Sequence, residues 1–253
     1  MISVKSGREI ECMRNAGRIA ALALIEGGRL ARPGNSTKQI DDAMRRLIRK
    51  HGAHPSFLGY RGFPASSNTS VNNEVIHGIP SRRKILREGD IISIDVGAYF
   101  QGFHGDTAAT FAVGNVSEEA RRLIEVTRES FYQGAAKAVP GARICDIGRA
   151  VCDYAESHGC GVVRDWTGHG VGRELHEDPE IPNFLEGKRG PRLLSGMTLA
   201  IEPMITTGSG ETEILRDGWT VVTTDGSLAA HYEHTVLVTP NGPEFLTQLD
   251  GSI

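Results

Sequence analysis

The stretch DVGAYFQGFHGDT, residues 95–107, predicts a β-hairpin that carries an aspartate near each end. The residues before it alternate or are β-branched, and the residues after it run on as FHGDTAATFAV, which is typical of a return strand. Gln101 and Gly102 suit the two central positions of a tight turn. A two-residue turn pairs Phe100 with Phe103, and that pairing fixes the register of both strands.

In this register the two aspartates of the hairpin share one face of the sheet. Asp95 lies opposite Ala108 and Gly97 lies opposite Asp106. The aspartates are therefore diagonal neighbours, with Cα atoms roughly 7–8 Å apart. Two carboxylates this close repel each other, so that one of them takes up a proton or a cation lies between them. Alternatively, the pair is solvated, or paired with Lys and Arg at a sheet edge.

Length and composition set the broad class. The chain has 253 residues, of which 39% are hydrophobic and 23% charged, enough for a sizeable core. A net charge of −3 argues against a nucleic acid or a membrane surface as the main partner. The net charge leaves a ribosome-associated role open. It does not indicate an oligomeric state, and we expect a monomer.

The cysteines and the amino-terminal segment indicate the compartment. Cys12, Cys145, Cys152 and Cys160 show no CxxC spacing, which fits a reducing environment, and we expect them to be small buried apolar residues. The first 15 residues lack the apolar core of a signal peptide, and no run of 18 apolar residues occurs. We therefore expect a cytoplasmic protein.

An internal repeat divides the sequence. Residues 31–52 align with residues 138–159 at an offset of 107, with Pro33-Gly34 recurring as Pro140-Gly141 and His51-Gly52 as His158-Gly159. The same offset carries Gly89, Ile94 and Asp95 onto Gly196, Ile201 and Glu202. An acidic residue thus recurs at the same place in both halves.

Capping residues set the expected helices. Ser6 with Glu9 and Ser36 with Gln39 form possible capping boxes, and Ser117 is a further N-cap. The predicted helices run from Ser6 to about Leu30, from Ser36 to near Gly52, and from Ser117 through Ala138. A fourth helix is expected after these and ends at Gly159.

Strands follow each pair of helices. The order predicts an α+β fold of two helix-helix-sheet halves, over about residues 6–113 and 117–245, within a single domain spanning 1–253. The helices are expected to cover one face of a largely antiparallel sheet and to leave the other face for a site.

Further acids and histidines lie near strands. Glu202 lies within the strand-like LAIEPM, where an unpaired carboxylate is costly, and Glu233 begins a β-branched strand with histidines at both sides. His169 and His176 lie in the glycine-broken WTGHGVGRELHEDP, and His77 precedes a Gly-Ile-Pro turn. Taken alone, His77 or His176 is typical of a turn or capping residue.

If the two halves face each other, one cavity collects the four acids Asp95, Asp106, Glu202 and Glu233 together with His169. Four carboxylates cannot all ionise there without compensating charge, and two divalent cations supply it. Oxygen donors with one imidazole suit Mn²⁺, Fe²⁺ or Co²⁺, and also admit Zn²⁺. Bridging carboxylates would hold the two ions about 3.5–4 Å apart.

The hairpin, NEVIHGIP, TGHGVGRELHEDP, LAIEPM, DGWTVVTTD and YEHTVLVT together resemble the type I methionine aminopeptidases in order and spacing over essentially the whole chain. The resemblance implies the pseudo-two-fold pita-bread fold, a dinuclear metal site, and removal of the initiator methionine from nascent polypeptides. It implies that Asp95 binds one metal through both oxygens, that His169 and Glu202 bind the other, and that Asp106 and Glu233 bridge them.

The resemblance also implies the catalytic roles. A hydroxide between the metals would attack the scissile carbonyl, with Glu202 as the proton acceptor and shuttle. His176 would polarise the carbonyl oxygen, and His77 would contact the scissile amide. The free α-amine of the substrate would approach the metal at Asp95, which implies an exopeptidase.

Specificity follows from the same resemblance. Tyr60, Phe63 and Trp219 would wall an apolar slot for methionine, although they are also typical core aromatics. Phe57 and Asn68 fall at pocket positions where some relatives carry cysteine. The family prefers a small second residue.

Two alternative functions remain open. An Xaa-Pro peptidase of the same fold would ordinarily carry a large extra amino-terminal domain, whereas a helix is expected here from Ser6. A non-catalytic binding protein would be expected to lack several metal ligands. The 30 residues between Glu202 and Glu233 leave no room for the insertion of the type II enzymes, and the absence of a Cys-rich or Pro-rich amino-terminal extension indicates a bare bacterial catalytic domain.

Overall fold

The structure is a computed structural model, and it describes residues 2–185, 187 and 189–249. Over these residues, the helices are α1 (Gly7–Leu30), α2 (Thr37–Lys50), α3 (Glu118–Ala135) and α4 (Ile144–Ser157), with a short 3₁₀ turn at Tyr60–Gly62. The strands are β1 (His54–Pro55), β2 (Ser67–Val71), β3 (Glu74–Ile76), β4 (Ile91–Phe100), β5 (Phe103–Ala112), β6 (Gly161–Val162), β7 (Gly168–Gly170), β8 (Glu177–Ile181), β9 (Thr198–Ile201), β10 (Met204–Thr206), β11 (Thr212–Ile214), β12 (Val221–Thr223), β13 (Ala229–His231), β14 (Glu233–Thr239) and β15 (Gly242–Phe245).

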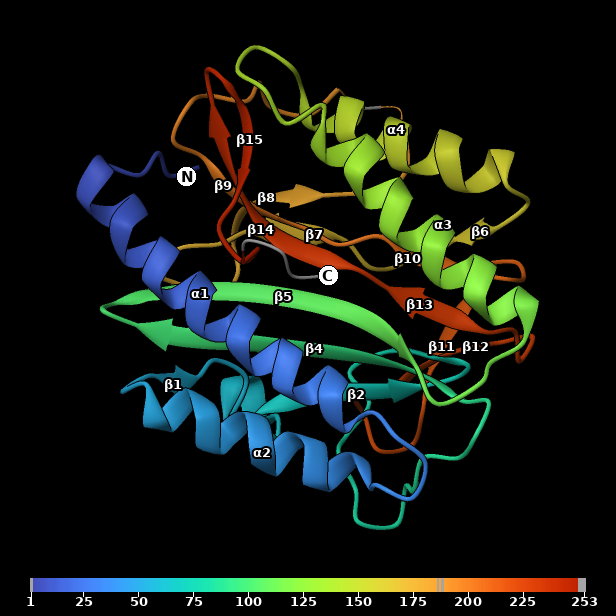
Figure 1. Cartoon of the computed structure of the whole chain (residues 1–253). Coiled ribbons are helices and arrows are strands. Elements are labelled where there is room, and N and C mark those ends of the chain that lie inside the picture. Colours follow the sequence, from blue (N-terminus) through green and yellow to red (C-terminus); the bar gives the residue numbers. More distant parts are fainter. Residues whose placement is uncertain (1, 186, 188, 250–253) are drawn as a thin grey trace.

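The central sheet joins the two halves of the chain. Its strands run in the order β1-β4-β5-β14-β9-β7-β8, with β2 beside β4 and β15 beside β14, and the paired strands are antiparallel. The joint lies between β5 of the first half and β14 of the second (Figure 1). Two smaller sheets, β13-β10-β6 and β11-β12-β3, lie beside it.

The hairpin of β4 and β5 has the predicted register. Phe100 pairs with Phe103, and Asp95 pairs with Ala108. Gln101 and Gly102 both have positive φ, 53° and 85°, as a two-residue turn of the primed type requires. The prediction of both strands and of their turn is confirmed.

The helices begin where capping residues indicate. The backbone N–H of Ser6 donates to Glu9 Oε2 at 2.9 Å, and Ser117 Oγ accepts from the N–H of Ala120 at 3.1 Å. Helix α3 ends at Ala135, three residues before the predicted end, and the chain turns at Ala136 and Lys137.

The duplication predicted from the sequence recurs in the backbone. Helix α4 begins and ends 107 residues after α2. The isolated bridges Ser36 to Ile85 and Arg143 to Arg192 are related by the same offset. The α+β fold of two duplicated helix-helix-sheet halves, with a largely antiparallel sheet, is confirmed.

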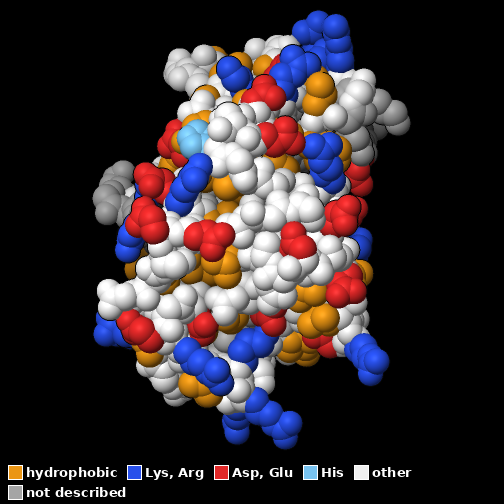
Figure 2. Space-filling model, turned by 90° about the vertical axis from the view of Figure 1, so that its right-hand side faces the viewer, with side chains coloured by type: hydrophobic (Ala, Val, Ile, Leu, Met, Phe, Trp, Pro, Cys, Tyr) orange, Lys and Arg blue, Asp and Glu red, His pale blue; other side chains and the backbone are white. Residues whose placement is uncertain are grey.

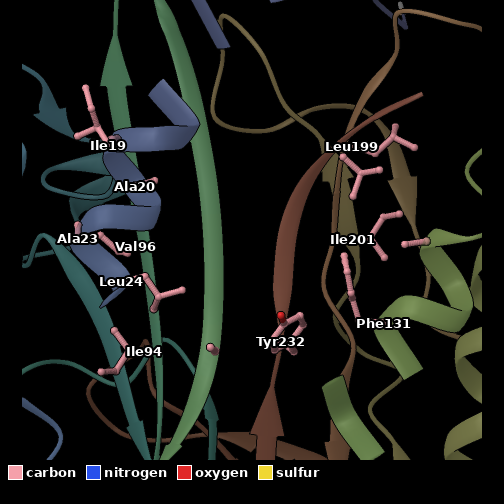
Figure 3. Close-up of a cluster of buried hydrophobic side chains, with 14 of the residues drawn as sticks. Ile19, Ala20, Ala23, Leu24, Ile94, Val96, Phe131, Leu199, Ile201 and Tyr232 are labelled. Carbon is pink, nitrogen blue, oxygen red and sulfur yellow. The ribbon is translucent and has the colours of Figure 1, made fainter. Parts of the chain in front are cut away.

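The main core lies between the helices and one face of the sheet (Figure 3). Side chains of α1, such as Leu24, pack against Ile94 and other residues of β4, while Phe131 of α3 packs near Ile201 of β9. Burying each large apolar side chain contributes about 1.5–3 kcal/mol. Because side chains alternate along a strand, the opposite face of the sheet is left for polar residues.

Some sequence expectations need correction. Glu202 is not inside a strand but directly follows β9, at a break before β10 begins at Met204. Only Cys152 is buried, whereas Cys12, Cys145 and Cys160 are half-buried. Cys12 and Cys160 pack at the edges of core clusters, and none of the four cysteines forms a disulfide.

The surface carries both signs of charge. On the face turned toward the viewer in Figure 2, acidic and basic side chains are interspersed with apolar ones. This distribution accords with the small net charge of −3. Among the described residues, no helix combines the length and the apolar character needed to cross a membrane.

Candidate metal centre

A cavity of about 680 Å³ opens on the face of the sheet that the helices leave free. It collects side chains from both halves of the chain. Every site residue predicted from the sequence lines it: Phe57, Tyr60, Phe63, Asn68, His77, Asp95, Asp106, His169, His176, Glu202, Trp219 and Glu233.

Three of the four acids are placed by the joint between β4, β5 and β14. Ala108 of β5 pairs with Asp95 on one side and with Glu233 on the other, so that these two acids lie in one row of the sheet. Asp106 lies two residues before Ala108 and therefore points to the same face.

Hydroxyl groups hold two of these acids across the joint. Thr235 Oγ1 accepts from the N–H of Asp106 at 3.0 Å and donates to its carbonyl oxygen at 2.9 Å. Thr107 Oγ1 donates to the carbonyl oxygen of Glu233 at 2.8 Å. The backbones that carry Asp106 and Glu233 are thus fixed to each other, as a preorganised site requires.

His169 presents one ring nitrogen to the cavity. Its Nδ1 lies 2.9 Å from the carbonyl oxygen of Gly170, an acceptor, so Nδ1 carries the proton in the neutral ring. Its Nε2 lies 3.5 Å from Glu202 Oε1 and keeps a free lone pair. Burial lowers the pKa of His169 to about 4, which keeps the imidazole neutral and able to bind a metal.

His231 is a further member of the cluster and was not among the predicted site residues. Its buried Nε2 lies 3.4 Å from Glu202 Oε2. Glu202, His231 and Glu233 each bring a ligand atom within 4.8 Å of the other two, and Asp106, His169 and Glu233 do the same. The signal in the sequence is the i, i+2 spacing of His231 and Glu233, which in an extended chain puts both side chains on one face.

Several atoms of the cluster lack partners. Among the described residues, Asp95 Oδ1, Asp106 Oδ1, Glu233 Oε1 and His231 Nε2 are buried without a hydrogen bond. A buried polar atom without a partner costs roughly 1–3 kcal/mol, and more when charged. Atoms of this kind, converging from separate strands, are what bound cations would satisfy.

The electrostatics indicate the same need for positive charge. Burial raises the pKa of Asp95 to about 7 and that of Glu202 to about 8. Burial, together with repulsion from the neighbouring acids, raises the pKa of Asp106 and of Glu233 well above the ordinary range. Divalent cations would stabilise all four ionised forms, and the donor set of carboxylates and neutral imidazole fits Mn²⁺, Fe²⁺, Co²⁺ or Zn²⁺.

The two other predicted histidines line the cavity and are less buried than His169, since His77 is half-buried and His176 is exposed. His176 lies between rings, with centroids 4.1 Å from His169 and 5.1 Å from Tyr60. His77 follows β3 with a positive φ of 58° and meets the ring of Trp166 edge-on at 5.2 Å. Burial lowers the pKa of His77 to about 4.

An apolar pocket adjoins the acids. Phe57, Phe63 and Leu175 form a buried cluster, against which Tyr60 and Trp219 pack. The rings of Phe63 and Trp219 meet edge-on at 5.1 Å. Asn68, predicted to line the substrate pocket, does line the cavity, but its amide contacts Asp95.

Comparisons with known proteins agree with this geometry. The family model of metallopeptidase family M24 matches residues 11–240. The methionine aminopeptidase of Clostridium acetobutylicum is 54% identical over 247 residues, covering 98% of this chain and 99% of the relative. Methionine aminopeptidase 1 of Bacillus subtilis is 50% identical over 249 residues, covering 98% and 100%.

A solved structure shows the same fold. The crystal structure of methionine aminopeptidase from Thermotoga maritima superposes with a TM-score of 0.96 at 44% sequence identity, covering 98% of this chain and 100% of that one. The chain therefore belongs to metallopeptidase family M24 and, within it, to the bacterial type I methionine aminopeptidases.

Proposed function

We propose that this chain removes the amino-terminal methionine from nascent proteins and peptides whose second residue is small. The observation that carries the proposal is the convergence of five ligand-type side chains, three of them with unpartnered buried oxygens, beside an aromatic pocket. The relatives that match nearly the whole chain are methionine aminopeptidases, and they support the same activity.

The metal ligands in this proposal are Asp95, Asp106, His169, Glu202 and Glu233, and they would hold two divalent cations, whether Co²⁺, Mn²⁺, Fe²⁺ or Zn²⁺. When bound, such ions act as Lewis acids and make water a nucleophile at neutral pH. The positive charge would keep the four carboxylates ionised, which is the form that binds metal.

The protein's own groups would handle the proton and the substrate. Glu202, whose carboxylate lies beside His169 and His231, would take the proton of the attacking water and pass it to the leaving amine. His176 would stabilise the developing charge on the carbonyl oxygen, and His77 would orient the scissile amide. Both histidines line the same cavity as Glu202, which supports these roles.

The pocket accounts for the choice of methionine. An unbranched thioether fits between Phe57, Phe63 and Trp219, with Tyr60 beside them, and sulfur makes favourable contacts with ring edges. The free α-amine of the substrate would lie toward the acids. An acetylated amino terminus would therefore be a poor substrate.

A peptide panel tests the proposal. Metal-free protein is assayed with Mn²⁺, Co²⁺, Fe²⁺ or Zn²⁺ on Met-Ala-Ser, on its acetylated form, and on an Xaa-Pro peptide that is the substrate of the alternative activity. We expect release of methionine from Met-Ala-Ser only. Full turnover in the presence of a strong chelator would refute the mechanism, and preferred cleavage of the Xaa-Pro peptide would refute the specificity.

We propose further that the chain is a monomer with one catalytic domain and that it acts in the cytoplasm on emerging polypeptides. The free cysteines among the described residues support a reducing compartment. Sedimentation at micromolar concentration tests the monomer, since a dimer would double the observed mass. Co-sedimentation with ribosomes tests a ribosome-associated role.

A further inference from the structure

Asn68 and Asp95 face each other across two neighbouring strands. They are direct partners in the register of β2 and β4, so their side chains leave the sheet on the same face. The amide nitrogen of Asn68 donates to Asp95 Oδ2 at 2.6 Å. This distance is short for an N–H···O bond and shows that the amide contacts the carboxylate directly.

The bond gives different partners to the two oxygens of Asp95. Oδ2 is held by Asn68, whereas Oδ1 is buried without a hydrogen-bond partner among the described residues. Asn68 itself is only 6% exposed, so water does not compete effectively for its amide. The donor therefore fixes the rotation of the carboxylate and leaves Oδ1 available to a cation.

The substrate gives Asn68 no alternative partner of equal strength. The methionine side chain has no hydrogen-bond donor, and its thioether is a weak acceptor. The aromatic side chains of Phe57, Phe63 and Trp219 supply the apolar surface instead. The amide of Asn68 is engaged by a metal ligand, and this distinguishes it from the residues that form the pocket.

We propose that Asn68 is a positioning residue for Asp95, and that its side-chain amide sets the affinity of the metal position to which Asp95 contributes. This inference rests on the proposed function. Groups that hydrogen-bond to a metal ligand typically contribute a factor of about 10–100 to metal affinity. Asn68 would therefore act on metal binding first and on turnover only through it.

A matched control lies just beyond the end of the same strand. Asn72 Nδ2 donates to Asp90 Oδ1 at 2.9 Å, which is the same amide-to-carboxylate bond, and Asn72 Oδ1 accepts from the N–H of Ile91 at 3.0 Å. Neither Asn72 nor Asp90 lines the cavity. Replacing Asn72 removes this bond and the bond to Ile91, at a backbone φ of 57°, without touching the site.

The experiment titrates Mn²⁺ into metal-free wild type, Asn68→Ala, Asn68→Cys and Asn72→Ala by isothermal calorimetry. Thiol is a weak donor, so we expect metal affinity in the order wild type, Asn68→Cys, Asn68→Ala, with a total loss of about 10–100-fold. Asn72→Ala should bind metal like the wild type. If Asn68→Ala does not fold, the metal affinity of Asn68→Cys still tests the proposal.

Steady-state kinetics separate positioning from substrate binding. At saturating Mn²⁺, Asn68→Ala should keep the KM for Met-Ala-Ser within about twofold, since a positioning role leaves the pocket intact. Unchanged metal affinity with a raised KM would make Asn68 a pocket residue and overturn the inference. If wild type binds metal but releases no methionine, the proposed function fails, while the ranking of metal affinities still decides the role of Asn68.

Discussion

His169 Nε2 lies 3.5 Å from Glu202 Oε1, although the two residues are separated by 32 others in the sequence. The contact arises because β7 and β9 are neighbours, with His169 paired to Ala200, two residues before Glu202. Nε2 and Oε1 are close enough to share one cation. The first prediction follows from this pair.

His169→Ala should lose metal, whereas His176→Ala should keep it. His169 offers a neutral Nε2 inside the cluster, while His176 is exposed and contacts the ring of His169. We expect His169→Ala to bind fewer ions per chain and to be inactive, and His176→Ala to bind the wild-type number with kcat reduced roughly 10²–10³-fold. Metal analysis of both purified variants, alongside circular dichroism to establish folding, checks the difference. Equal metal content in the two variants would contradict it.

Asp106→Asn should stabilise the metal-free protein and remove its response to metal. The pKa of Asp106 is raised well above the ordinary range by burial and by Asp95 and Glu202. A negative charge on Asp106 therefore destabilises the folded state. An amide of the same shape carries no charge. We expect the melting temperature in chelator to rise by a few degrees, since ~2–4 °C corresponds to each kcal/mol in a chain of this size. Wild type should gain far more than the variant from added Mn²⁺, and a lower melting temperature of the variant in chelator would refute the account of the crowded acids.

The metal-free protein should lose stability as the pH rises from about 6.5 to 8.5. The pKa values of Asp95 and Glu202 are raised by burial from 3.8 to about 7 and from 4.5 to about 8. In this range the folded state holds protons that the unfolded state has released, so the free energy of unfolding falls with increasing pH. The contribution of Asp95 and Glu202 to the free energy of unfolding is complete below their pKa values in the unfolded state. It is lost as the pH rises through their pKa values in the folded state. Buried histidines such as His169 act in the opposite direction, but only below about pH 6.5, where unfolded imidazoles take up protons.

Urea unfolding in chelator at three pH values measures this slope. Glu202→Gln removes one of the four acids with raised pKa values and should reduce the slope, while saturating Mn²⁺ should abolish it because the ionised acids then have a partner. A metal-free wild type whose stability is constant or increases over this range would show that these acids do not carry raised pKa values.

Trp219→Ala should impair substrate binding more than turnover. Trp219 is half-buried and packs edge-on against Phe63 at the wall of the cavity, so its loss removes apolar contact with methionine. We expect KM for Met-Ala-Ser to rise on the order of tenfold, with metal content unchanged. A fall in kcat at constant KM would place Trp219 in a different role.

Local rules sufficed for the hairpin and the helices. The turn at Gln101 and Gly102 sets the pairing of β4 with β5, and capping residues such as Ser6 and Ser117 mark helix starts. The internal repeat predicted a relation between distant residues as well. It aligned Asp95 with Glu202, although the pairing of strands between the two halves was not known. Acids and a histidine near predicted strands supplied the other candidate ligands, and the resemblance to a family implied the role of each.

The sequence alone did not predict contacts between strands that are far apart in the chain. The pairing of Asn68 with Asp95 requires the register of β2 on β4, and no short turn fixes that register. His231 pairs with Met204 of β10, and this pairing brings it beside Glu202. The break of the strand at Glu202, by contrast, has a local signal, since Pro203 follows Glu202 and has no N–H to donate to a neighbouring strand.

Calorimetric titration of the metal-free protein with Mn²⁺ tests the central claim most directly, because it counts the cations that the buried acids hold. We predict two ions per wild-type chain, fewer in His169→Ala, and methionine release that rises in step with metal occupancy. A wild-type chain that binds no divalent cation, yet still releases methionine, would contradict the account.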